Sequence, residues 1–329
     1  MTQYEVVGIG NAVVDVITHA DDSFLDHMGI QKGIMQLIER ERAEVLYASM
    51  ESRIQTPGGS VANTVAGVGA LGLKTGFIGR VNDDALGQFY ADAMNQGGTD
   101  FVNAPIKDGA LPTSRCMVFV SPDGERSLNT YLGISSDLGP EDVSEDVAGQ
   151  AEIIFLEGYL FDKDKGKEAF LQAARNCRAA NGKTGIAISD PFCVDRHRDE
   201  FAGLIKDGKI DILFSNEDEI KSLYQVDSFD EAKAKVSKNV EIAALTRGEK
   251  GAVIINGDDE FVIAAEAVDQ VIDTTGAGDQ FAAGFLYGFT EDMDMATCGK
   301  LGAIAAAEVI SHIGPRPLVS LAELQAKAA

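Results

Sequence analysis

Short apolar runs and helical patterns alternate along almost the whole chain. Helical stretches such as residues 60–71 and 165–181 lie between apolar runs that are short enough to be strands. The runs that predict strands cover residues 4–10, 75–81, 152–156, 184–189, 211–215 and 241–246. Strands that alternate with helices in this way form a mostly parallel sheet with helices on both faces. The pattern therefore predicts an α/β fold.

Four further segments interrupt this alternation and predict short strands, at residues 12–17, 34–38, 113–120 and 126–132. Pro122-Asp123-Gly124 predicts a hairpin turn between the last two. We expect the four strands to form a small antiparallel sheet that acts as a lid beside the main sheet. Because the chain shows no repeat, low-complexity tract or long linker, we expect a single domain over residues 1–329, with the lid formed by about residues 12–50 and 113–132.

The composition limits the classes of partner and the cellular compartment that we expect for this protein. The chain has 28 basic and 52 acidic residues, and its net charge of −24 repels nucleic-acid phosphates, so we expect no nucleic-acid partner. No segment approaches the roughly 20 apolar residues of a membrane span, and no secretory signal is visible, so we expect no membrane partner. The four cysteines are far apart and form no CxxC pair, which disfavours a disulfide framework or a zinc site. These features predict a cytoplasmic protein.

The clearest chemical motif is Asp273-Thr274-Thr275-Gly276-Ala277-Gly278-Asp279, between a strand-like run at 267–272 and a helical pattern at 280–289. The backbone N–H groups of its small residues can surround an anion, and the helix start adds partial positive charge. Asp279 can then take a proton from an attacking hydroxyl while those amides hold a phosphoryl group. A lone GxGD would indicate only a capped helix after a glycine turn. The longer pattern DTTGAGDxFxxGF favours phosphoryl transfer.

Three near matches to other nucleotide-binding motifs fail. Gly67–Gly72 fits GxGxxG but closes a predicted helix, so it indicates packing and a helix end. The pair Gly8 and Gly10 follows a strand, yet Val13 stands where the dinucleotide fingerprint needs glycine. Lys183-Thr184 resembles the end of a P-loop, but Cys177 stands where its first glycine belongs. The glycine turn before Asp279 is therefore the better phosphate site.

A second polar cluster lies near the amino terminus. Gly58-Gly59-Ser60 precedes a predicted helix and Asn63 lies in its first turn, and we assign these residues to substrate binding. Two glycines allow a substrate to approach the backbone, and the Asn63 amide both donates and accepts hydrogen bonds. Asn11 and Asp15 follow the first strand, and their side chains suit a vicinal diol. A turn and a capping carboxylate would explain Asn11 and Asp15 equally well.

Taken together, these motifs resemble one family. The sequence is similar to the ribokinase-like (PfkB) carbohydrate and nucleoside kinases. The matching segments are 58–63, 78–87, Asn216-Glu217-Asp218-Glu219, Thr246-Arg247-Gly248 and 273–279. They occur in the order typical of the family and span nearly the whole chain.

The resemblance implies a ribokinase-like fold, with ATP and Mg²⁺ as cofactors. It implies that Asp279 is the catalytic base and that the amides of Gly276, Ala277 and Gly278 form the anion hole. Asn216 and Glu219 would organise Mg²⁺ and the phosphates, largely through water, since Mg²⁺ keeps several waters. Without the resemblance, Asn216 to Glu219 would indicate only a solvated helix start.

Two further pairs take their roles from the resemblance. Thr246 and Gly248 would lie beside the ATP phosphates. Asp273 and Thr275 match positions where relatives bind a monovalent cation, so K⁺ is a further cofactor to test, with Thr275 also close to the nucleotide.

The spacing of Asn11 and Asp15 is similar to that in adenosine kinases, as is the hairpin at residues 122–133. We therefore hypothesise a nucleoside kinase in which Asn11, Asp15, Gly59 and Asn63 hold the ribose. The 5′-hydroxyl would point at Asp279, and the purine would lie against lid residues such as Val13 and Leu132. Arg126 in the hairpin would neutralise the transferring phosphate, although a solvated hairpin charge explains it equally well.

Two alternatives stay open at this point. One is a sugar kinase acting on ribose, fructose or 2-keto-3-deoxygluconate. The other is a nucleoside-binding protein without catalysis, which the intact Asp279 motif argues against. The sequence is compatible with a monomer or a homodimer, because it does not reveal which face of the lid is covered.

Overall fold

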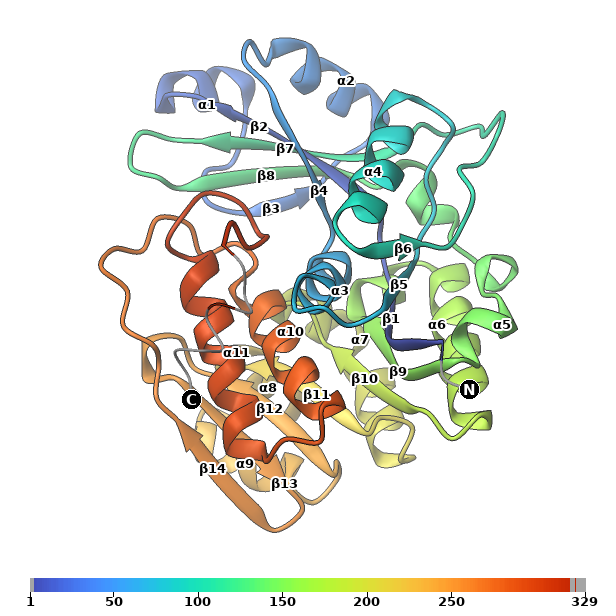
Figure 1. The fold of residues 1–329 in the computed structure, drawn as a ribbon. Coiled ribbons are helices and arrows are strands. Elements are labelled where there is room, and N and C mark those ends of the chain that lie inside the picture. Colours follow the sequence, from blue (N-terminus) through green and yellow to red (C-terminus); the bar gives the residue numbers. More distant parts are fainter. Residues whose placement is uncertain (1–2, 320–322, 324–329) are drawn as a thin grey trace.

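The computed structural model describes residues 3–319 and 323. Its main sheet has nine strands in the order β14-β13-β12-β11-β10-β9-β1-β5-β6 (Figure 1). These are β1 Tyr4–Ile9, β5 Thr75–Ile78, β6 Thr99–Phe101, β9 Ala151–Glu157, β10 Lys183–Ala187, β11 Ile212–Asn216, β12 Ile242–Thr246, β13 Ala252–Asn256 and β14 Asp259–Ile263. All neighbours from β12 to β6 are parallel, and β13 and β14 are antiparallel. The predicted mostly parallel α/β sheet is confirmed.

Each of the six runs predicted for this sheet overlaps a strand, but three other strands were missed. Strand β6 is only three residues long, and β13 and β14 form an edge hairpin that turns at Gly257, where φ is 59°. The prediction of a strand over residues 267–272 is wrong. That segment is irregular, and Val271 and Ile272 are 52% and 41% exposed, because no neighbouring strand pairs with it in the described part of the chain.

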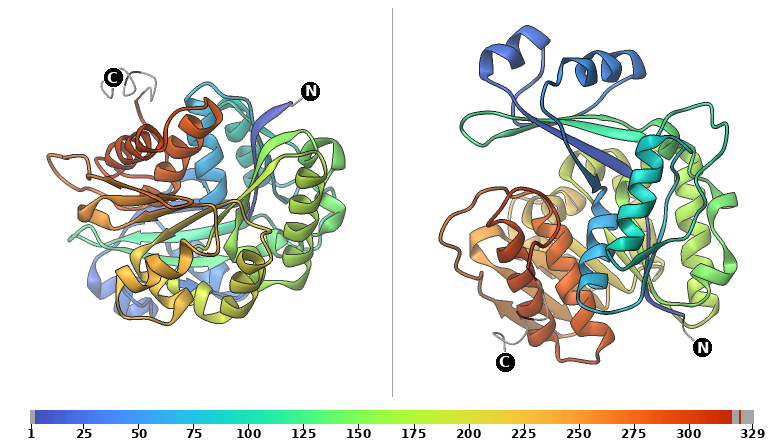
Figure 2. Two further views of the ribbon diagram at one scale, coloured as in Figure 1. Left: turned by 90° about the horizontal axis from the view of Figure 1, so that it is seen from below. Right: turned by 45° about the horizontal axis from the view of Figure 1, so that its top comes forward.

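Helices cover both faces of the main sheet (Figure 2). One face packs against α3 Ser60–Ala70, α4 Ala85–Gln96, α10 Ala277–Thr290 and α11 Met295–Val309. The opposite face packs against α5 Glu145–Ala148, α6 Asp164–Ala179, α7 Pro191–Lys206, α8 Glu217–Tyr224 and α9 Phe229–Val236. Short 3₁₀ helices lie at Gly133–Asp137, Pro140–Asp142, Gly158–Asp162 and Gly248–Lys250.

Helices α3 and α10 contact each other although about 200 residues separate them along the chain. Their approach is close, because a Cβ atom on Gly67 would lie 2.3 Å from Oε1 of Gln280. Gly67 belongs to the GxGxxG match, and α3 ends at Ala70, so the prediction that this match closes a helix is confirmed. The contact places the starts of both helices, and hence both motifs, at the same end of the molecule.

A second sheet has five strands in the order β3-β8-β7-β2-β4. They are β2 Val13–His19, β3 Met35–Leu37, β4 Ile54–Gly58, β7 Ser114–Val120 and β8 Arg126–Tyr131. The prediction of four antiparallel strands is wrong in two respects: β4 adds a fifth strand beyond residue 50, and the β2–β7 and β3–β8 pairs are parallel. Strand β4 is hard to recognise because Ile54 is 66% exposed and the strand ends in Pro57-Gly58.

The two faces of this lid sheet differ. Helices α1 Asp22–Met28 and α2 Arg40–Ser49 cover the outer face, where Leu25 and Leu46 pack with Val16 and Phe119. The inner face carries a small apolar cluster that includes Val13 and the other inward residues Ile17, Cys116, Val118 and Val120. The chain itself therefore covers the outer face of the lid sheet.

None of the helices in the described residues is both long enough and apolar enough to cross a membrane. All four cysteines are buried and free.

Candidate active site

The site lies where the direction of the main sheet reverses. From β1 the chain order proceeds through β5 and β6 to one side, whereas β9 and β10 follow on the other. Crevices that bind ligands form beyond the carboxyl ends of strands at such a switch point. Here Asn11 follows β1 and Glu157 ends β9, and the Asn11 backbone N and Nδ2 donate to Glu157 Oε1 at 3.1 and 2.7 Å. The two strand ends are thus bonded to each other.

Glu157 was not predicted from the sequence. Its Oε2 accepts from the backbone N of Val61 at 3.2 Å, which ties the start of α3 to the switch point. Burial raises the pKa of Glu157 to about 7, although the hydrogen bonds from Asn11 and Val61 oppose this rise. Ser135, also missed, donates to Asn11 Oδ1 at 2.5 Å. The only sequence signal for Glu157 was a carboxylate at the end of an apolar strand.

Asp279 lies in the first turn of α10, directly beside the start of α3. Its two oxygens accept from Ser60 Oγ at 2.7 Å and from Asn63 Nδ2 at 3.1 Å. Burial raises the pKa of Asp279 to about 6, while these two bonds and the charge of Arg316 oppose the rise. The structure therefore joins the two motifs that the sequence places at opposite ends of the chain.

Asp15 reaches the same place from the lid. It lies on β2 opposite Thr56 of β4, and a Cβ atom on Gly58 would be 2.5 Å from its Oδ2. Gly59 has φ of 97°, and a Cβ atom there would be 2.3 Å from the carbonyl oxygen of Asn11. Both glycines are therefore needed for backbone to pass between Asp15 and Asn11. Burial raises the pKa of Asp15 to about 6, and Arg126 and Arg316 oppose this rise.

The lid also brings Arg126, on β8, to the glycine turn. Its Nη1 donates to Asp273 Oδ2 and, at 2.7 Å, to Thr275 Oγ1. Its Nε and Nη2 are buried and have no hydrogen-bond partner among the described residues. Burial favours a raised pKa for Asp273, but the N–H groups of Gly314 and Thr275, together with Arg126, hold it below its ordinary value. Arg126 is thus no solvated hairpin charge.

The glycine turn itself is held by a carboxy-terminal segment that sequence reasoning overlooked. Gly276 is the N-cap of α10 with φ of 80°, and a Cβ atom there would be 2.7 Å from the Cα of Pro315. Gln280 Nε2 donates to the carbonyl oxygens of Asn63 and Pro315 at 3.0 and 3.1 Å. Arg316 Nε donates to Asn63 Oδ1 at 3.3 Å. The run Gly314-Pro315-Arg316-Pro317 could have pointed to this segment, because its two prolines restrict the backbone and exclude a regular helix.

On the other side of the crevice, Asn216 and Thr246 are paired residues at the ends of β11 and β12. Asn216 and Glu219 form a reciprocal capping box at the start of α8, with Glu219 N to Asn216 Oδ1 at 2.8 Å and Asn216 N to Glu219 Oε2 at 3.0 Å. Burial, and then the nearby Asp190 carboxylate, raise the pKa of Glu219 to about 8. Gly248 lies just beyond β12 with φ of 59°.

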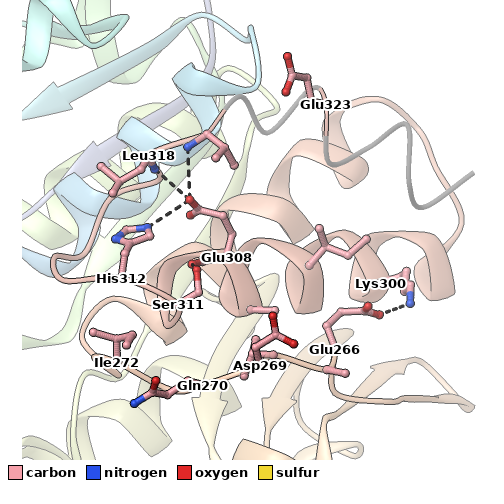
Figure 3. A pocket seen from close by; sticks show the side chains of 15 residues that line it. Glu266, Asp269, Gln270, Ile272, Lys300, Glu308, Ser311, His312, Leu318 and Glu323 are labelled. Atoms are coloured by element: carbon pink, nitrogen blue, oxygen red, sulfur yellow. Dashed lines mark hydrogen bonds and ion pairs between the residues drawn. The ribbon is translucent and has the colours of Figure 1, made fainter.

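A cavity of about 740 Å³ lies between residues 266–272 and α11 (Figure 3). One wall is the irregular segment that ends at Ile272, next to Asp273, and the other is the exposed side of α11. Val268, Ile304, Ala307 and Leu318 contribute apolar surface. The Glu266–Lys300 ion pair borders it, as does the contact between Glu308 Oε1 and His312 Nε2 at 3.1 Å. The sequence did not predict this cavity, because residues 267–272, which form part of its wall, were expected to be a strand.

A second cavity, of about 680 Å³, lies under the lid. Its walls are the inner ends of β2, β4 and β7, including Ile17, Thr56 and Val120, and the turn at Ile313 and Gly314. Thr56 is the residue opposite Asp15, so this cavity is next to the acceptor side of the site.

This fold and its site define a class: a ribokinase-like kinase, with a lid sheet over the switch point of a mostly parallel sheet. The chain belongs to the pfkB family of carbohydrate kinases, whose sequence model matches residues 32–320.

Two solved structures and one relative illustrate the similarity. A probable sugar kinase from Rhizobium etli CFN 42 is 46% identical with a TM-score of 0.94, covering 100% of both chains. Adenosine kinase from Sinorhizobium meliloti is 46% identical with a TM-score of 0.93, covering 99% of this chain and 100% of the other. An uncharacterized sugar kinase of Archaeoglobus fulgidus is 29% identical over 76% of this chain and 96% of its own length. The protein is therefore a kinase of small molecules, sugars or nucleosides.

Proposed function

We propose that this kinase transfers the γ-phosphoryl group of ATP to the 5′-hydroxyl of a nucleoside such as adenosine. The observation that carries the proposal is the cavity under the lid, whose walls include Ile17 and Val120 beside Asp15. A ribose held by Asp15 would extend its base into this largely apolar space, whereas a free sugar would leave the space without a ligand group. The similarity to the S. meliloti adenosine kinase supports the same acceptor.

In this proposal Asp279 is the general base. With a pKa of about 6 it is largely ionised at neutral pH, so it can accept the proton of the attacking hydroxyl. Ser60 and Asn63 hold its two oxygens in place. Gly58, Gly59 and Asn63 would border the ribose, with Asp15 accepting from its hydroxyls. The Asn11 amide is bonded to Glu157 and Ser135, so it would support the ribose site chiefly by holding Glu157.

The phosphoryl group would lie at the start of α10. The first amides of a helix have no partner within it, so those of Gly276 and Gly278 are available to an anion. The Ala277 amide donates to the Thr274 carbonyl oxygen at 3.3 Å and would exchange this bond for one to the anion. The buried and unpartnered Nε and Nη2 of Arg126 would donate to the same phosphoryl oxygens from the lid. Lid and turn would then enclose the transferring group and exclude water.

ATP would occupy the nucleotide side. Its base fits the cavity between residues 266–272 and α11, and its phosphates would pass Thr246 and Gly248 on the way to Thr275. Asn216 and Glu219 would hold a hydrated Mg²⁺, because a nearby divalent cation would favour the charged form of Glu219, which burial and the Asp190 carboxylate otherwise disfavour. When bound, Mg²⁺ would neutralise phosphate charge.

Potassium is left out of the proposal. The oxygens of Asp273 and Thr275 that the resemblance assigns to K⁺ already accept hydrogen bonds from Arg126, and Asp273 also accepts from Gly314 N. A guanidinium group therefore supplies the positive charge at this position, and the residues do not fit a monovalent cation in this arrangement.

The test is steady-state kinetics with ATP and adenosine, ribose, fructose or 2-keto-3-deoxygluconate. We expect kcat/KM for adenosine to exceed that for each free sugar by at least about tenfold, because only the nucleoside fills the apolar cavity. A clear preference for a free sugar would overturn the nucleoside assignment and favour the second candidate, a sugar kinase, which the names of the R. etli and A. fulgidus proteins support. Absence of phosphoryl transfer to every acceptor, with nucleoside binding intact, would instead favour a binding protein.

A further inference from the structure

Arg316 lies behind the acceptor side of the site and has no role in any of the motifs described above. Its guanidinium group is placed by the irregular segment after α11, and its Nη2 contacts Sδ of Met94 at 3.1 Å. Tyr90, whose hydroxyl donates to the Gly58 carbonyl oxygen at 2.9 Å, is a charge neighbour of Arg316. Arg316 thus meets α3 and α4 where both border the acceptor site.

The contact between Arg316 and Asn63 fixes the orientation of an amide. Guanidinium groups only donate hydrogen bonds, so Arg316 must face the Asn63 oxygen, Oδ1. The Asn63 NH₂ group is then turned toward Asp279, whose ionised carboxylate can only accept. Reversing the amide would break both bonds. Arg316 therefore determines which side of Asn63 Asp279 meets.

The same guanidinium group matters for charge. Asp279 is faced by Asp15 from β2 and by Glu157 from β9, and Ser60 and Asn63 contribute only neutral donors. The charge of Arg316 opposes the raised pKa of Asp279, and it acts on Asp15 as well, together with Arg126 and Asp273. Tyr90 on α4 faces Arg316 itself. Without this cation, a cluster of partly and fully buried carboxylates would bind protons more readily.

We propose that Arg316 is a positioning residue of this kinase, which orients Asn63 toward Asp279 and supplies the half-buried positive charge that keeps Asp279 ready to accept a proton. This inference rests on the proposed function, in which Asp279 is the base. Arg316 acts through Asn63 and through its charge, and contact with substrate is not required for either effect.

Two variants separate the two effects. Arg316→Gln keeps a donor for Asn63 Oδ1 but removes the charge, and Arg316→Lys keeps the charge but loses the planar guanidinium. Arg196→Met is the matched control. Arg196 lies on α7, outside the site, and forms a partly exposed salt bridge with Asp162, so this variant also removes one arginine charge. For each variant we would measure kcat and KM with ATP and adenosine from pH 5 to 9, and the melting temperature.

For Arg316→Gln we expect the acid limb of the kcat/KM profile to move up by about one pH unit, because an opposite charge near Asp279 is lost. For Arg316→Lys we expect the limb to stay in place and kcat to fall about tenfold, as the oriented bond to Asn63 weakens. Arg196→Met should match the wild type. If the limb of Arg316→Gln stays within 0.2 units of wild type, or if that of Arg316→Lys moves as far as that of Arg316→Gln, the proposal is wrong.

A direct measurement covers the case in which the acceptor is wrongly assigned. The Asp279 carboxyl can be titrated by NMR in ¹³C-aspartate-labelled protein without substrate, with Asp279→Asn to identify its signal. We expect its midpoint to rise by about one unit in Arg316→Gln, and an unchanged midpoint in a folded variant would refute the charge effect. A wild type that phosphorylates no acceptor would overturn the proposed function and leave this titration to decide the role of Arg316. Should Arg316→Gln fail to fold, Arg316→Lys still decides: an acid limb that moves up by about one unit, or a kcat equal to that of the wild type, would refute the proposal.

Discussion

The acceptor side and the nucleotide side of the crevice are built in different ways. On the acceptor side, Asp279 is bonded to Ser60 and Asn63 across more than 200 residues of sequence, and Asp15 arrives from a separate lid sheet. On the nucleotide side, Asn216 and Glu219 bond to each other within one helix turn. The acceptor side therefore depends on tertiary packing, whereas the Asn216–Glu219 part of the nucleotide side is a local structure. Substitutions should affect the two sides differently.

The largest effect is expected for Asp279→Asn. Asparagine keeps the shape of the side chain but cannot accept the proton, so kcat should fall by roughly three orders of magnitude or more. Adenosine affinity by calorimetry should change little. Asp26→Asn, on the exposed surface of α1, is the control and should leave both values unchanged. A kcat within tenfold of wild type would exclude Asp279 as the base.

Gly59→Ala should damage the acceptor side through the backbone. Its φ of 97° and a Cβ contact of 2.3 Å with Asn11 O leave no room for a side chain, so we expect a loss of about 2–4 kcal/mol in unfolding free energy and a lower kcat/KM for the acceptor. Gly72→Ala is the matched control, because Gly72 has φ of 99° with no atom within 4 Å of the added Cβ. Gly72→Ala should lower the unfolding free energy only by the strain that its positive φ imposes on alanine. Equal losses in denaturant titrations would show that crowding at Asn11 does not matter.

Glu219→Gln tests the nucleotide side through pH. The pKa of Glu219 is about 8 in the folded chain and 4.5 ordinarily, so between these values the folded protein binds the extra proton. Wild-type stability should therefore fall with rising pH across this window and then level off. Glutamine keeps the capping geometry but does not titrate. Between pH 5 and 8, the unfolding free energy of the variant should therefore rise relative to that of the wild type, by at most about 1.4 kcal/mol per pH unit.

Denaturant titrations at several pH values measure this difference. A constant difference across the window would mean that Glu219 is ionised in the folded protein. In the same variant the Mg²⁺ requirement for turnover should rise, while adenosine affinity stays unchanged, because the two sides are built separately.

The smallest effect is expected for monovalent cations. Since Arg126 occupies the oxygens of Asp273 and Thr275, replacing K⁺ by tetramethylammonium should leave wild-type kcat within about twofold. Arg126→Met should lower kcat and make the remaining activity sensitive to K⁺. A strong potassium requirement in the wild type would show that Arg126 leaves Asp273 during turnover.

Recognition from the sequence was best where function is carried by short contiguous motifs. The glycine turn before Asp279 and the Gly58-Gly59-Ser60 segment could be assigned a chemical role because their small and polar residues lie within a few positions of each other. Glu157, Ser135 and Arg316 were missed because each is a single polar residue whose partner lies far along the chain. The lid sheet was only partly predicted, since parallel pairing between β2 and β7 cannot be inferred from either strand alone.

The sequence by itself determined the alternation of strands and helices, the glycine turn, and the family to which the chain belongs. Apolar periodicity and glycine conformation act over a few residues, so they are readable without a structure. Only the tertiary structure decided that Arg126 donates a hydrogen bond to Asp273 and that Arg316 donates one to Asn63. It also decided that Asp15, Glu157 and Asp279 lie together in one site. Burial and long-range charge set the pKa values of these carboxylates, and both depend on how distant segments pack.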